Sequence, residues 1–114
     1  MVIASAITIL TIRKEKIWVR DKIPEIISTQ GKKCLVEIMD DATYLEMVDK
    51  KLGEELEEYY KDGSIEELAD LLEVLYAAVA ARGYTLDELE RVRKEKLLKR
   101  GGFEKKLLLK QVEE

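Results

Sequence analysis

Apolar side chains recur at intervals of three and four residues along most of the chain, which is the spacing of α-helices. Between about residues 40 and 60 they fall at Leu45, Val48, Leu52 and Leu56, so one face of a helix carries all four. Gly53 is the weak position, because glycine costs about 1 kcal/mol relative to alanine in a helix interior. The pattern predicts one long helix with a single buried stripe.

The segment from residue 64 to about residue 82 has two apolar faces instead of one. The first face carries Leu68, Leu71, Leu72, Leu75 and Val79, and the opposite face carries Val74, Ala77, Ala78 and Ala81. A helix that is apolar on two sides packs on two sides. We therefore expect this helix to be central and to carry more apolar surface than one small subunit covers, which predicts a homodimer or higher homo-oligomer.

A further helix is predicted from Thr85 to about Arg100. Thr85 followed by Glu88 matches a capping box, which marks a helix start, and the glycine pair at 101–102 marks its end. Lys96 and Arg100 are four residues apart, so both side chains can point in one direction. Because apolar residues alternate with them, we expect the inner half of this helix to present these cations; long stems that follow apolar surface are the alternative.

Shorter elements are predicted before the long helices and after the last one. Pro24, the only proline, fits the first turn of a short helix with Asp21 as its N-cap. Residues 34–38 form either a short strand or an extended connector, and residues 103–112 form a tail that is either a strand or a docking segment. The sequence thus predicts an all-α fold, an antiparallel bundle of about four helices with short extended segments near both termini.

The first twelve residues differ from the rest of the chain because they carry no charge. The run is too short to span a membrane, and its β-branched residues suit a strand. An extension upstream of the domain is the alternative, since a charged run begins at Arg13. We assign residues 1–16 as an N-terminal extension and residues 17–114 as the helical domain.

Composition excludes several classes of function. The 114 residues include 20 Lys and Arg against 24 Asp and Glu, a net charge of −4, which argues against a nucleic-acid polymer as partner. No histidine is present, so histidine bases, Ser-His-Asp triads and histidine-bound zinc are excluded. Cys34 is the only cysteine and has no internal disulfide partner. No secretory signal is recognisable, so the cytoplasm is the expected compartment.

Two acidic pairs on consecutive predicted helices suggest a metal site. Glu55 and Glu58 are three apart, as are Glu67 and Asp70, and such pairs face one way on a helix. The turn at residues 61–64 folds the second helix back on the first, which brings the four carboxylates together. Hard divalent cations prefer such ligands. The alternative is a solvated acidic face, with Glu67 capping its own helix behind Ser64.

The same residues resemble a known superfamily. Glu-x-x-Glu on one helix and Glu-x-x-Asp on the next, together with the phrases WVRDKIPEII, EELADLLEVLYA and KRGGF, resemble the MazG-like all-α nucleoside triphosphate pyrophosphohydrolases. The phrases closely resemble the phosphoribosyl-ATP pyrophosphohydrolase-like subgroup, and the resemblance covers roughly residues 17–109. The resemblance implies a MazG-like helical fold and an oligomer with sites near the subunit contacts.

The resemblance also implies a reaction. It is the Mg²⁺-dependent cleavage of a nucleotide between its α- and β-phosphates, giving a monophosphate and pyrophosphate, with Mn²⁺ as an alternative metal. Metals orient phosphates and stabilise developing charge, and Glu54 or Glu55 would accept the proton of the attacking water.

Phosphate binding requires cations, since a net-acidic protein repels a triphosphate. We expect at least two of Arg20, Lys22, Lys96 and Arg100 to contact phosphate oxygens. The alternative function is a non-catalytic helical module of the same fold that binds a nucleotide or a protein partner.

Overall fold

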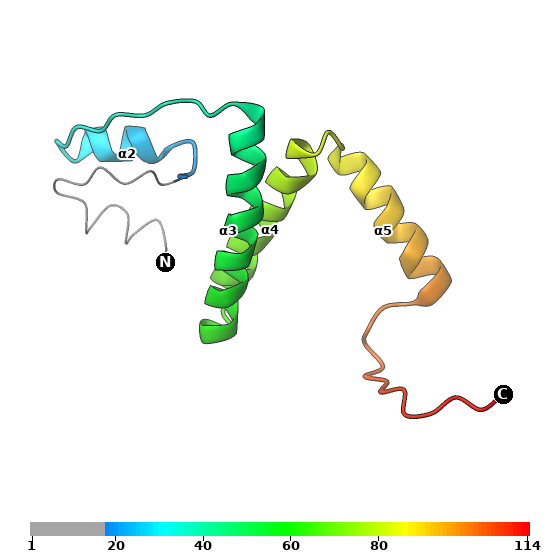
Figure 1. The fold of residues 1–114 in the computed structure, drawn as a ribbon. Coiled ribbons are helices and arrows are strands. Elements are labelled where there is room, and N and C mark those ends of the chain that lie inside the picture. Colours follow the sequence, from blue (N-terminus) through cyan, green and yellow to red (C-terminus); the bar gives the residue numbers. More distant parts are fainter. Residues whose placement is uncertain (1–17) are drawn as a thin grey trace.

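The computed structural model describes residues 18–114 as four α-helices (Figure 1). They are α2 (Ile23–Thr29), α3 (Asp41–Asp62), α4 (Ile65–Ala81) and α5 (Leu86–Arg100). No strand occurs among these residues, so the predicted all-α class is confirmed. The predicted extension or strand at residues 1–16 lies outside the described part of the chain.

The centre of the fold is an antiparallel hairpin of α3 and α4, which lie side by side in Figure 1. Gly63 ends α3 in the left-handed conformation, with φ of 60°, which glycine adopts without steric cost. Ser64 then caps α4, and its Oγ accepts a hydrogen bond from the backbone N–H of Glu67 at 3.2 Å. The predicted turn is therefore present, with α3 continuing two residues beyond residue 60.

The buried residues of the hairpin are few. Val48 of α3 is fully buried, and Val74 and Ala78 of α4 are each 8% exposed. They belong to the stripe predicted for α3 and to the alanine-rich face predicted for α4. That second face is the one that packs against α3, and the leucine face of α4 is left largely open, with Leu72 45% exposed.

Three of the four helices begin at an N-cap residue whose side chain accepts a backbone hydrogen bond. Asp40 accepts a hydrogen bond from the backbone of Thr43 at 2.7 Å to cap α3, and Thr85 caps α5 in the same way. The prediction of Asp21 as the cap of α2 is wrong. Lys22 occupies that position with a helical backbone and makes no side-chain capping bond, so α2 starts instead from the fixed φ of Pro24 in its first turn.

Helices α2 and α5 extend to opposite sides of the hairpin (Figure 1). The segment before α2 contacts α3 through Trp18. Its ring packs edge-on against the ring of Tyr44, with 5.6 Å between the two ring centroids. Helix α5 has no buried residue, so the predicted inner half does not form within one subunit. The reason is that α5 leaves α4 at the turn around Gly83, so it makes only a few contacts with α4 among the described residues.

Two stretches are extended and irregular. Residues 32–40 connect α2 to α3, which settles the choice between strand and connector in favour of the connector, and residues 107–114 follow α5 as a tail. Within the described range, no helix is long and apolar enough to cross a membrane.

Candidate metal centre

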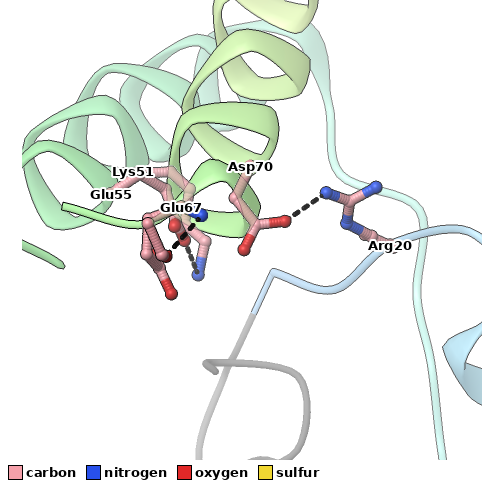
Figure 2. A network of polar contacts seen from close by, with 6 residues as sticks. Arg20, Lys51, Glu55, Glu67 and Asp70 are labelled. Atoms are coloured by element: carbon pink, nitrogen blue, oxygen red, sulfur yellow. Dashed lines mark hydrogen bonds and ion pairs between the residues drawn. The ribbon is translucent and has the colours of Figure 1, made fainter. Parts of the chain in front are cut away.

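The acidic residues predicted from spacing meet along the α3–α4 hairpin. Glu55 of α3 and Glu67 of α4 are 2% and 4% exposed, the two buried charged residues of the described chain. Figure 2 shows both carboxylates pointing toward one another, with Asp70 beside them. Burial of carboxylates costs free energy unless a partner compensates the charge. The location of these side chains therefore requires an explanation beyond a solvated acidic face.

Two overlapping groups of carboxylates form the site. Oxygen atoms of Glu55, Glu67 and Asp70 all lie within 4.8 Å of one another, and those of Glu58, Asp62 and Glu67 do the same. Glu67 belongs to both groups and so links all four predicted residues. Asp62, in the last turn of α3, is a fifth carboxylate that the spacing of the pairs did not indicate.

Two oxygen atoms in this cluster have no partner. Oε2 of Glu55 and Oε2 of Glu67 are buried and make no hydrogen bond with any described residue. A buried acceptor without a donor costs about 1–3 kcal/mol, and native structures contain few of them. A divalent cation bound between these oxygens would supply the missing partner. The donor set fits a hard divalent cation, the class of metal that prefers carboxylate oxygens.

Lys51 is the nearest cation to the buried end of the cluster. Its Nζ lies 3.6 Å from Oε1 of Glu55 and 3.6 Å from Oε2 of Glu54, and its side chain is only 14% exposed. Burial raises the pKa of the Glu55 carboxyl above its ordinary value; the Lys51 charge lowers that pKa, and the charges of Asp70 and Glu67 raise it. Glu55 thus has one cation beside it and two carboxylates opposing its ionisation.

Arg20 covers the other end of the cluster. Its Nη2 donates a hydrogen bond to Oδ1 of Asp70 at 2.6 Å, across fifty positions of sequence (Figure 2). Arg20 was expected to contact phosphate, and the structure places it at the rim of the carboxylates. The segment before α2 is thereby joined to the centre of the hairpin, and one Asp70 oxygen is paired with a guanidinium.

Glu67 does not use its carboxylate to cap α4. The capping box predicts a bond from the Glu67 side chain back to the N-terminus of the helix. Only the other half of the box forms, in which Ser64 accepts from the Glu67 backbone. The Glu67 side chain turns into the cluster and stays unpaired at Oε2, which leaves it free to bind a cation.

The remaining predicted site residues lie outside the cluster. Glu54 is on its exposed rim, 49% exposed and paired with Lys51. Lys22 is exposed at the start of α2, and Lys96 and Arg100 are exposed on α5. Because α5 extends away from the hairpin in Figure 1, one subunit does not bring its two basic residues to the carboxylates.

Sequence reasoning missed Lys51, although a signal was available. Lys51 precedes Glu54 by three residues and Glu55 by four, the spacings at which helical side chains meet. The cation therefore lies on α3 itself, on the same helix as the two carboxylates that it pairs with. Asp62 also follows Glu58 by four residues, which places both on one face of α3.

Comparison with known proteins leaves the family open. No family model matches the sequence, and no curated protein or solved structure matches it. The likeness to MazG-like enzymes therefore rests on the acidic pairs and the flanking phrases of the sequence.

Proposed function

We propose that the chain is a Mg²⁺-dependent nucleotide pyrophosphohydrolase. The observation that carries the proposal is the pair of buried, unpartnered oxygens of Glu55 and Glu67 at the junction of two carboxylate groups. In an acidic cluster that serves only solubility, the carboxylates would be exposed to solvent and each oxygen would be hydrated. The resemblance to MazG-like sequences supplies the reaction, and the cluster supplies a place for the metal that this reaction requires.

Different residues of the site would bind the metal and transfer the proton. Glu55, Glu58, Glu67 and Asp70 would hold the metal, which when bound orients the phosphates and stabilises the charge that develops on them. Glu54 lies on the rim of the site and remains accessible, so it is better placed than the buried Glu55 to accept the proton of an attacking water. Lys51 lies between them and would hold the Glu54 carboxylate in place.

Phosphate binding draws on cations from two places. Arg20 is already at the rim, and on binding a nucleotide its guanidinium would exchange Asp70 for a phosphate oxygen. Lys96 and Arg100 are distant within one subunit, so we propose that they act on the site of a neighbouring subunit in a homo-oligomer. The open leucine face of α4, with Leu68, Leu72 and Leu75 each 40–45% exposed, supports such an assembly.

A pyrophosphate-release assay tests the activity. Purified protein is incubated with a panel of canonical and modified nucleoside triphosphates, with Mg²⁺, with Mn²⁺ and with EDTA. We expect release that requires metal, is lost in Glu67→Gln, and persists in the matched control Glu66→Gln, an exposed neighbour on α4.

The same assay also recognises the alternative. If the protein binds Mn²⁺ through Glu67 yet releases no pyrophosphate from any nucleotide, the non-catalytic binding module is the better description. Light scattering measures the assembly, and a species of only 13.2 kDa at working concentration would contradict the homo-oligomer.

A further inference from the structure

Two irregular segments of the described chain, residues 33–39 and 107–114, carry strongly exposed apolar side chains. Leu35 and Ile38 are 99% and 100% exposed, and Leu107, Leu108 and Leu109 are 80–85% exposed. Isolated apolar residues on a surface are ordinary, but contiguous runs at this exposure indicate an interaction site. Both runs therefore need a partner that buries them.

The backbone of both segments is also unpaired within the part of the chain that the structure describes. Among residues 18–114, no backbone–backbone hydrogen bond involves residues 33–39 or residues 107–114, and neither segment is helical. An extended chain with unpaired N–H and C=O groups is a template for strand pairing. The two segments lie on opposite sides of the molecule in Figure 1, one beside α2 and the other beyond α5, so a second copy supplies the natural partner.

The sequences of the two segments are complementary in one antiparallel register. If Leu35 lies opposite Val112, every pair on that face matches charge with opposite charge or apolar with apolar. The pairs are Lys33 with Glu114, Leu35 with Val112, Glu37 with Lys110, and Met39 with Leu108. Directly opposite residues in a sheet interact, and like charges there are destabilising.

Other registers lose this match. A shift of two residues in either direction places Glu37 opposite Leu108 or Val112, and Leu35 opposite Lys110 or Glu114. A parallel arrangement that keeps Glu37 opposite Lys110 also matches Leu35 with Leu108 and Met39 with Val112, but it places Lys33 opposite Lys106. The antiparallel register is favoured because it pairs Lys33 with the opposite charge of Glu114 instead.

We infer that two copies of the chain exchange their tails, residues 107–114 of each pairing as an antiparallel strand with residues 33–39 of the other. The arrangement is symmetric, because each copy offers one segment of each kind, as a closed two-fold dimer requires. This interface is separate from the leucine face of α4 and does not depend on the proposed activity. It assigns a role to the tail, which the carboxylate cluster does not use.

Cross-linking between differently tagged chains tests the pairing in the full-length protein. The register places Cys34, the only cysteine, opposite Glu113. The wild-type chain is co-refolded with Cys34→Ser/Glu113→Cys and oxidised, and we expect a disulfide-linked heterodimer on non-reducing gels. The matched control, Cys34→Ser/Gln111→Cys, moves the thiol by two positions on the same face and should lose most of that band.

Charge reversal provides the second measurement. Glu37→Lys and Lys110→Glu each place like charges opposite one another, so each should shift the protein toward monomer in sedimentation, and the double variant should restore the dimer. Glu104→Lys, an exposed change outside both segments, should have no effect, and circular dichroism checks that every variant is folded. The inference is overturned by a monomeric wild type, by failure of the double variant to recover, or by absence of the Cys34–Glu113→Cys heterodimer.

Discussion

Replacing Glu55 by glutamine tests two effects of its buried charge: the stability that the metal-free fold loses, and the binding of a divalent ion. Glutamine has nearly the same shape as glutamate but carries no charge, so Glu55→Gln removes a buried negative charge while keeping the packing around it. In metal-free protein this charge is opposed by its burial and by Glu67 and Asp70. We therefore expect Glu55→Gln to stabilise the metal-free fold and to lose binding of the divalent ion.

The magnitude follows from the unpartnered atoms. Glu55 is 2% exposed and its Oε2 has no hydrogen-bond partner among residues 18–114, a situation that costs about 1–3 kcal/mol. The substitution also removes the Glu55 pairing of Lys51, which keeps its second partner Glu54. A net gain of about 1 kcal/mol would raise Tm by about 4–8 °C in a domain of this size.

The stability difference between Glu55→Gln and wild type should depend on pH, in a direction set by the pKa of Glu55. Because the folded-state pKa of Glu55 is raised, the folded protein holds this proton more tightly than the unfolded chain does. The stability contributed by protonated Glu55 is complete below the ordinary value of 4.5 and is lost as pH rises through the raised pKa. The stability difference between Glu55→Gln and wild type should therefore widen as pH increases above about 4.5.

Urea unfolding measures this difference in EDTA and in saturating Mg²⁺. Wild type should gain stability with Mg²⁺, by about 2.7 kcal/mol at one hundred times the Kd, and Glu55→Gln should gain little. Glu57→Gln, an exposed neighbour on α3, is the control and should behave as wild type in both conditions. A metal-free Glu55→Gln protein that is less stable than wild type at neutral pH would refute the reasoning, since the buried charge would then be stabilising.

Four further substitutions test the surroundings of the cluster. Lys51→Met leaves Glu55 without its nearest cation, so the metal-free protein should lose about 1–3 kcal/mol in urea unfolding while Mn²⁺ affinity, measured by titration, rises; weaker binding would mean that Lys51 positions the ligands. Arg20→Ala frees Asp70, so Mn²⁺ binding should tighten while KM for the best nucleotide rises severalfold, and an unchanged KM would exclude a phosphate contact. Lys96→Ala and Arg100→Ala should lower kcat/KM at unchanged Mn²⁺ affinity; wild-type kcat/KM in both would remove these residues from the site.

The local features of the fold could be predicted because short stretches of sequence determine them. Ser64 and Thr85 cap their helices, and Gly63 reverses the chain, through bonds that span three or four residues. The inward placement of Glu67 also followed from periodicity, since it shares a face with Val74 and Ala78. These positions depend on the angle of 100° per residue and on little else.

Features that depend on contacts between distant elements could not be predicted in the same way. The pairing of Arg20 with Asp70 requires the segment before α2 to cross the hairpin, and no periodicity indicates that path. The inner half predicted for α5 assumed that the helix folds back onto the bundle. Its apolar positions, among them Val92 and Leu97, are 39% and 47% exposed instead, because helical spacing defines a face without defining what packs on it.

The open shape and the buried cluster are consistent with one another in an assembly of several chains. The hairpin alone positions the carboxylates, so the candidate metal site is complete within one subunit. Lys96 and Arg100 are exposed on α5, and most apolar residues of both extended segments are exposed in that subunit. A second copy would cover the extended segments, and it can bring Lys96 and Arg100 to the rim only if its α5 approaches the hairpin. Assembly would then control phosphate binding while leaving metal binding intact, which predicts that a monomeric Glu37→Lys variant retains its Mn²⁺ affinity.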